Sequence, residues 1–188
     1  MTLIDSRPGI RAVYEQLVIE SGAAIDIDLV VSRLGPPLEW ELQHWLPAGD
    51  ISRWADRYRE LYPTIAMPLV EALPGAHDAI EAANRVGRTI LLTAKHAPNA
   101  RLHVERLGLP VGEVFGGSWR EAKGVVLREQ DATAYVGDHV HDMDAARIAG
   151  IPAVGVATGP CSTSELREAG AATVLTTLED FPAWVECM

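Results

Sequence analysis

The sequence predicts an α/β protein with a Rossmann-like, doubly wound parallel sheet and a small all-helical domain attached at the N-terminal side. Between residues 7 and 70 apolar residues recur at helical spacing, and no stretch has the pattern of a strand. After Pro74-Gly75, short apolar runs alternate with longer helical segments, which is typical of βαβ units. We therefore expect a helical domain over residues 6–70 and an α/β core over residues 71–188, to which residues 1–5 also belong.

Four helices are expected in the helical domain. Gly35-Pro36-Pro37 separates the first two from the last two, because proline and glycine interrupt helical hydrogen bonding. The helices are indicated by Val13, Leu17 and Val18, by Val30, Val31 and Leu34, and by the stretches Leu38–Leu46 and Ile51–Tyr62. Three tryptophans, Trp40, Trp45 and Trp54, are expected in the core of this bundle, since buried indole rings contribute large apolar area.

The core alternates strands with helices. Strands are expected at Thr89–Leu92, Val114–Phe115, Ala132–Val136, Ala153–Val156 and Thr173–Leu175. Helices are expected at Ala76–Val86, Asn99–Leu107, Lys123–Glu129, Ala145–Ala149, Ser162–Ala169 and Leu178–Val185.

Composition narrows the class of partner. The 188 residues carry a net charge of −10, which argues against a nucleic-acid surface and against anionic membranes. No apolar run reaches the ~18 residues of a membrane span, and no signal peptide is visible. Cys161 and Cys187 make no disulfide framework. We expect a cytoplasmic protein.

The stretch from Ala132 to Gly150 indicates an active site. A strand ends at Gly137, Asp138 follows, and Asp142 stands four residues further on, before a helical pattern. Ligands of open α/β folds bind at the carboxyl ends of the strands. Two carboxylates there suit Mg²⁺, which takes one or two carboxylates and keeps several waters. The alternative is a helix N-terminus with acidic residues that favour its dipole.

Two further polar residues occupy similar positions. Thr93 ends a buried strand, so that its hydroxyl and the N–H groups after it, from Ala94 onward, are placed to hold an anion. Lys123 lies just inside a helix start, where its charge opposes the dipole and calls for a partner. The alternatives are a threonine that caps the next turn and a solvated lysine.

Thr93, Lys123, Asp138 and Asp142 together resemble, in order and context, three of the four motifs of the haloacid dehalogenase-like (HAD) superfamily. The resemblance continues through a helical cap over residues 7–67 and is nearest to members of the phosphoglycolate-phosphatase type. It implies a Mg²⁺-dependent phosphatase, a hydrolase that acts on a small phosphorylated metabolite. By resemblance, Thr93 and Ala94 hold the phosphoryl oxygens, Lys123 bridges phosphate and nucleophile, and Asp138 binds Mg²⁺ with Asp142 behind it.

The first family motif, Asp-x-Asp-Gly-Thr, is not present. Met1 and Thr2 stand where its glycine and threonine belong, and the nucleophilic aspartate, the acid–base aspartate and the strand before them are missing. Asp5 lies too far along the chain to replace them. The resemblance therefore implies a chain that is inactive as given.

Three explanations stay open. A truncated sequence or a misassigned start codon implies a longer, functional enzyme. A non-catalytic relative would bind a phosphorylated ligand or a protein partner. A receiver-like phosphoacceptor domain also uses aspartates, a threonine and a lysine at strand ends, but the helical insert and the order of motifs speak against it.

The resemblance also implies a defect in the sheet. The strand of the first motif lies between the strands that end at Thr93 and Val136. Without it, these two strands either pair directly or leave a gap that is filled by water, by a neighbouring chain or by Leu3-Ile4.

Three other residues need a role. His139 and His141 form a His-x-His pair that suggests zinc, but no nearby Cys or His completes a tetrahedral set, and we expect exposed loop histidines. Cys161 has no evident base partner and is expected to be structural or incidental. The substrate and the oligomeric state are not indicated.

Overall fold

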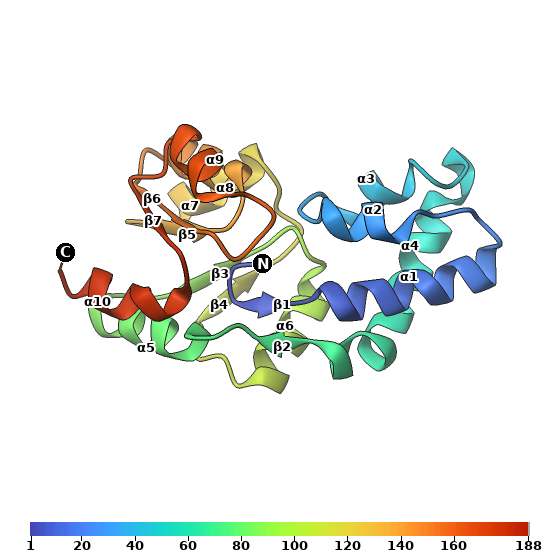
Figure 1. Ribbon diagram of the computed structural model, residues 1–188, viewed down its shortest axis with the longest axis horizontal. Helices are drawn as coiled ribbons and strands as arrows, with labels where there is room; N and C mark the ends of the chain where they lie inside the picture. Colours follow the sequence, from blue (N-terminus) through green and yellow to red (C-terminus); the bar gives the residue numbers. More distant parts are fainter. Residues whose placement is uncertain (188) are drawn as a thin grey trace.

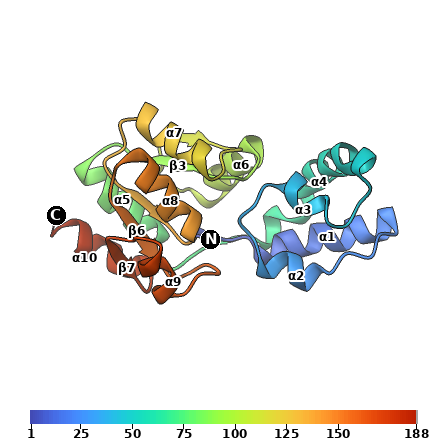
Figure 2. The ribbon, with the colours of Figure 1, turned by 90° about the horizontal axis from the view of Figure 1, so that it is seen from above.

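The computed structural model describes residues 1–187, and these form two lobes (Figure 1). The helical lobe holds α1 (Arg7–Ser21), α2 (Ile27–Ser32), α3 (Leu38–Leu42) and α4 (Ile51–Ile65), with 3₁₀ turns at Ala48–Asp50 and Met67–Leu69. The core lobe holds the remaining elements. Met1 lies between the two lobes in both ribbon views (Figures 1 and 2).

The helical lobe packs around the contact of α1 with α4. Pro8 stands in the first turn of α1, and Gly22 ends the helix with a left-handed φ of 69°. The apolar side of α1, including Val13 and Leu17, is fully buried in one cluster with Tyr58 and Tyr62 of α4. This cluster is separate from the clusters of the core lobe. The domain boundary near residue 70 stays a prediction, and the separation of the two apolar clusters agrees with it.

Two expectations for the helical lobe were wrong. The third helix ends at Leu42 rather than Leu46, where the chain turns before Pro47. Trp54 is buried in the bundle and Trp45 packs against it, but Trp40 lies elsewhere. Its ring centroid is 6.2 Å from that of Trp119 in the core lobe, so Trp40 contributes to the contact between the lobes.

The core lobe follows the expected alternation. Its strands are β3 (Ile90–Leu92), β4 (Glu113–Phe115), β5 (Tyr135–Gly137), β6 (Ala153–Val156) and β7 (Thr173–Leu175). Its helices are α5 (Ala76–Val86), α6 (Ala97–Leu107), α7 (Glu121–Glu129), α8 (Val140–Ala149), α9 (Thr163–Glu168) and α10 (Phe181–Val185), the last preceded by a 3₁₀ turn at Leu178–Asp180.

Two boundaries around the acidic stretch differ from expectation. β5 starts at Tyr135 rather than Ala132, because Ala132 N–H still bonds the Leu127 carbonyl and so completes the end of α7. α8 begins at Val140 rather than Ala145. Its N-terminus is closed by a capping box in which the His139 ring accepts a backbone N–H and the Asp142 carboxylate accepts the N–H of His139.

The parallel sheet is interrupted. β3 pairs with β4, and β6 pairs with both β5 and β7, all in parallel, as a doubly wound core requires. Among residues 1–187 no ladder joins β3 to β5. Of the two expected outcomes, direct pairing of these two strands is therefore not observed. Leu3-Ile4 does not fill the space as a central strand, because the short β1 (Ile4–Asp5) pairs antiparallel with β2 (Glu71–Ala72).

None of the helices in the part of the chain that the structure describes is long and apolar enough to cross a membrane.

Candidate active site

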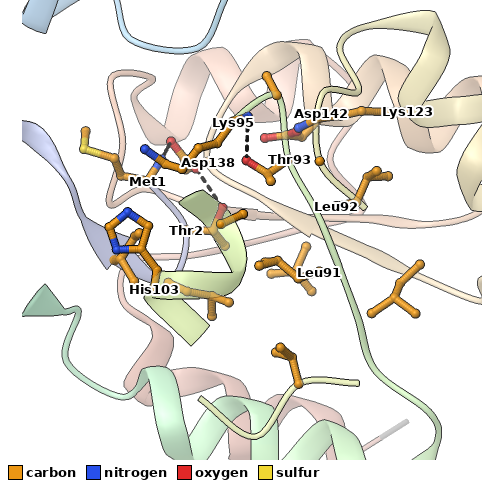
Figure 3. Close-up of a pocket in the computed structure, with 18 of the residues that line it drawn as sticks. Met1, Thr2, Leu91, Leu92, Thr93, Lys95, His103, Lys123, Asp138 and Asp142 are labelled. Atoms are coloured by element: carbon orange, nitrogen blue, oxygen red, sulfur yellow. Dashed lines mark hydrogen bonds and ion pairs between the residues drawn. The ribbon is translucent and has the colours of Figure 1, made fainter. Parts of the chain in front are cut away.

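A cavity of about 1290 Å³ lies between the two lobes and reaches the carboxyl ends of β3 and β5. Thr93, Ala94, Lys123, Asp138 and Asp142, the residues singled out from the sequence, all contribute to its lining. Figure 3 shows four of them around one space, with Thr93 leaving β3, Asp138 following β5 and Asp142 on α8. On the helical side the lining includes Gly35-Pro36-Pro37, Tyr58 and Tyr62.

Asp138 directly follows β5 and is only 5% exposed. Its carboxylate accepts a hydrogen bond of 2.7 Å from the Thr2 hydroxyl and pairs with the α-amino group of Met1 (Figure 3). Burial by itself would raise the pKa of this carboxyl, but the Met1 amine and the Thr2 hydroxyl outweigh it and lower the pKa. Asp138 is therefore an ionised, buried carboxylate at the floor of the cavity.

The loop after β6 holds Asp138 from the other side. A Cβ placed on Gly159 would overlap the Oδ2 atom of Asp138, so only glycine allows the backbone to approach the carboxylate this closely. Gly137 has a similar relation to Asp142, whose side chain lies against its Cα.

Lys123 has the partner that its position at a helix start requires. Its Nζ donates a 2.6 Å hydrogen bond to Oδ1 of Asp142 and a 3.1 Å hydrogen bond to Oη of Tyr135. Burial alone would lower the lysine pKa, but the Tyr135 oxygen and the Asp142 carboxylate raise it above its ordinary value. The solvated-lysine alternative does not apply, because the side chain is only 12% exposed.

Tyr135 is a site residue that the sequence reasoning missed. Its hydroxyl lies 3.2 Å from Asp142 Oδ1 and 3.3 Å from the Leu92 carbonyl oxygen on β3. Burial is the largest of several effects that raise its pKa. The available signal was a tyrosine two residues before Gly137 in a run otherwise made of small residues.

Thr93 takes part in the local turn that was considered as its alternative role. Its Oγ1 accepts the N–H of Lys95 at 3.1 Å, and its carbonyl accepts the N–H of Ser118 at 3.1 Å. The hydroxyl proton remains available to donate, since the turn uses only the oxygen as acceptor. Turn formation and anion binding are therefore compatible at this residue.

Asp138 and Asp142 are hard oxygen donors, the type that Mg²⁺ prefers. Within residues 1–187 no three His, Cys, Asp or Glu side chains gather as a metal site. Two carboxylates still fit Mg²⁺, because this ion commonly takes one or two from the protein and fills its remaining positions with water and phosphate oxygens.

The two histidines do not lie in an exposed loop, contrary to expectation. His139 is half-buried, and its Nδ1 accepts the N–H of His141 at 3.1 Å, so its ring serves as the cap of α8. His141 is half-buried in the first turn of α8, where its ring centroid lies 5.9 Å from that of Trp119. Cys161 is half-buried beside an apolar cluster that contains Met143 and Leu166.

Comparison with known proteins identifies the fold. Residues 101–181 match the family model described as HAD-hydrolase-like. A search of curated protein sequences found no match. Many solved structures are similar. A haloacid dehalogenase-like family hydrolase from Streptococcus pneumoniae has a TM-score of 0.83 and 20% identity, with 97% of this chain and 93% of that chain covered.

Two further structures carry informative descriptions. One, described as a predicted phosphoglycolate phosphatase from Haemophilus somnus, has a TM-score of 0.80 and 16% identity over 97% of this chain and 92% of that one. A HAD family hydrolase from Deinococcus radiodurans, described with bound phosphate and sodium, has a TM-score of 0.64 and 20% identity over 98% and 91%. The family match covers residues 101–181, and the solved structures show that the overall fold is that of haloacid dehalogenase-like hydrolases.

Proposed function

We propose that the cavity is the substrate site of a Mg²⁺-dependent HAD-type phosphatase that acts on a small, phosphoglycolate-like phosphate ester. The observation that carries the proposal is the arrangement of Thr93, Lys123, Asp138 and Asp142 around one partly closed cavity at the strand ends. Phosphoryl transfer depends mainly on positioning and on charge stabilisation, and these residues are suited to both.

Each residue has a distinct role in this proposal. Thr93 donates its hydroxyl proton to a phosphoryl oxygen, and the N–H of Ala94 serves the same anion, since the N–H of Lys95 already bonds Thr93 Oγ1. Lys123, held by Asp142, adds a fixed positive charge. Asp138 and Asp142 are the Mg²⁺ ligands, and the bound ion would neutralise charge on the transferring phosphoryl group. The helical lobe acts as a cap that limits the size of the substrate.

Two of the similar structures support a phosphorylated ligand. One is described with bound phosphate and another as a predicted phosphoglycolate phosphatase. The net charge of −10 does not oppose such a ligand. Lys123 and a bound metal ion would lie next to the phosphate, whereas the negative charges on the surface are more distant and are screened by salt.

The covalent step needs a nucleophile that the given chain does not supply at this position. Asp138 and Asp142 are the cavity-lining aspartates at the strand ends, and both serve the proposed metal site. Asp5 lies on β1, is held by Arg7 through hydrogen bonds of 3.0, 2.9 and 2.6 Å, and is not among the residues that line the cavity. We therefore propose that the 188-residue chain binds phosphate esters without turning them over.

The test compares binding with turnover. Calorimetry with methyl phosphate and Mg²⁺ is expected to show binding that Lys123→Met abolishes and that Ser164→Ala, a matched exposed-site control on α9, leaves unchanged. Phosphate release should stay at background for this chain and appear once a strand ending in Asp-x-Asp-Gly precedes Thr2. Methyl phosphate binding that is indifferent to Lys123→Met would refute the proposal.

A second candidate is a non-catalytic HAD-like protein that binds a phosphorylated ligand or a protein partner. It is favoured because, among the described residues, Thr93 and Lys123 are accompanied in the cavity lining by only two aspartates that follow strand β5, and the proposed metal site uses both. Binding that persists with no turnover after the added strand would select this candidate.

A further inference from the structure

A buried polar chain crosses from the core lobe to the helical lobe beside the proposed phosphoryl site. Lys95, two residues after Thr93, donates from Nζ to the Tyr62 hydroxyl at 2.7 Å, and its Nζ lies 4.6 Å from the centroid of the same ring. Tyr62 belongs to α4 and is fully buried. The Tyr62 hydroxyl in turn lies 3.0 Å from Nε2 of His103 on α6. All three residues line the cavity.

The direction of these hydrogen bonds follows from proton counting. An ammonium group can only donate, so the Tyr62 oxygen accepts from Lys95. The one hydroxyl proton of Tyr62 then goes to His103 Nε2, which makes His103 neutral with its own proton on Nδ1. This Nδ1 atom is buried and has no hydrogen-bond partner among residues 1–187. The Nδ1–H of His103 is therefore a buried donor without an acceptor among the described residues.

Lys95 is likewise incompletely satisfied. In the part of the chain that the structure describes, Nζ makes no ion pair with a carboxylate, and only one of its three protons has a partner. Burial lowers the pKa of Lys95 to about 8. Buried positive charge without a counter-charge is unfavourable, so the folded chain carries a cost that an anion at this position would offset.

We propose that Lys95, supported by Tyr62 and His103, is a specificity residue that binds a second oxyanion of the substrate, a carboxylate or a second phosphate. This inference rests on the proposed function, in which Thr93 and Lys123 hold the transferring phosphoryl group. The second anion lies on the side of the helical lobe, because Tyr62 belongs to α4. Substrates with two anionic ends are preferred over simple phosphate esters.

The chain contains only two lysines, Lys95 and Lys123, which permits a direct test. Protein with ¹³C at lysine Cε gives two titrating signals, one per site. Methyl phosphate, 2-phosphoglycolate and ethylene glycol bisphosphate share a phosphate ester and differ in the second anion. We expect the pKa of Lys95 to rise from about 8 when 2-phosphoglycolate or ethylene glycol bisphosphate binds, because each carries a second anionic group. With methyl phosphate the pKa of Lys95 should stay at about 8. The Lys123 signal should respond to all three ligands, because each carries the phosphate that Lys123 binds, and it reports that each ligand has bound.

Affinities supply a second readout. Both ligands with a second anion should bind at least about tenfold more tightly than methyl phosphate, which corresponds to one hydrogen bond to a charged group. A preference for only one of them identifies the anion as carboxylate or phosphate. Lys95→Gln should remove the advantage and leave methyl phosphate affinity unchanged. Arg101→Gln, which removes an exposed charge from α6, is the matched control.

Several outcomes would overturn the assignment. Equal affinities for the three ligands, an unshifted Lys95 signal in the wild-type chain, or an equal loss for all ligands in Lys95→Gln would each reject a second-anion role. The proposed function can fail separately. If Lys123→Met does not affect methyl phosphate binding while Lys95→Gln still abolishes the preference, the phosphoryl site is wrong and the Lys95 subsite stands. If none of the three ligands binds to the wild-type chain, both the proposed function and the Lys95 subsite are rejected.

Discussion

The Tyr135 hydroxyl lies 3.3 Å from the carbonyl oxygen of Leu92, so a side chain from β5 reaches the backbone of β3 where no ladder joins the two strands. The same hydroxyl lies within 3.2 Å of both Lys123 and Asp142. One tyrosine thus links the two parts of the sheet to the charged pair of the site.

Tyr135→Phe removes this hydroxyl and leaves the ring in place. We expect a loss of about 1–3 kcal/mol in the free energy of unfolding, because Lys123 loses an acceptor and the acceptor of the single hydroxyl proton, Leu92 or Asp142, loses a donor. Urea unfolding followed by circular dichroism measures the change. Tyr58→Phe is the matched control, since the Tyr58 ring is also buried but its hydroxyl makes no hydrogen bond with the described residues. Equal losses in the two variants would contradict this role.

Lys123 and Asp142 form an ion pair whose side chains are 12% and 7% exposed. Lys123→Met leaves the Asp142 carboxylate buried without its cation, and we expect a loss of about 3–5 kcal/mol. The double variant Lys123→Met/Asp142→Leu should recover a large part of that loss, because it removes both charges. Denaturant unfolding of the single and double variants measures the coupling. If the loss in the free energy of unfolding of the double variant equals the sum of the losses of the two single variants, the pair is not coupled.

His103 makes stability depend on pH. Burial, then the charges of Lys95 and Arg106, lower its pKa to about 3, against an ordinary value of about 6.5. The unfolded chain therefore binds more protons than the folded chain between about pH 3 and 6.5, so stability falls as the pH falls through that window and is insensitive to this group above it.

Between pH 7 and pH 5 the expected contribution of His103 is a loss of about 2 kcal/mol. The groups that face it are Tyr62 on α4, Lys95 after β3 and Arg106 on its own helix. His103→Gln should show a shallower decline than the wild type in urea unfolding at the two pH values. His77→Gln, on α5, should keep the wild-type slope. An unchanged slope in His103→Gln would show that this histidine does not carry the effect.

Gly159 is expected to tolerate no side chain. Gly159→Ala would place a Cβ onto Asp138 Oδ2, so either the loop after β6 or the carboxylate must move. We expect a loss of about 1–3 kcal/mol, typical of overpacking, together with weaker Mg²⁺ binding by calorimetry. Gly49→Ala is the control, because nothing lies within 4 Å of the added Cβ. A Gly159→Ala variant as stable as Gly49→Ala would contradict the close packing.

Regular elements were predictable where local signals agree. α5 runs from Ala76 to Val86 as expected, because its apolar spacing is regular and Gly87 follows it. β6 was also placed correctly, since Ala153–Val156 is a fully buried run. The start of α8 was missed, because a histidine is an unusual cap and the capping role of Asp142 was hidden by its interpretation as a metal ligand.

The sequence predicted which residues of the candidate site follow strands, but not the hydrogen bonds that connect the site to the helical lobe. Thr93 and Asp138 follow parallel strands, and such ends meet at one edge of a sheet. The contacts of Lys95 with Tyr62 and of Tyr62 with His103 join residues 33 and 41 positions apart on different lobes. No periodicity or local motif encodes such a pairing, which depends on how the helical lobe packs on the core.

The interrupted sheet has a consequence for cooperativity. In a continuous sheet, backbone ladders make neighbouring strands unfold together. Here, within the described residues, β3–β4 and β5–β6–β7 are connected by side chains, through Tyr135 and the apolar contacts of Leu92, and not by a ladder. We therefore expect the two parts to open separately, so that their amide protons exchange with solvent at different rates and with different sensitivity to denaturant.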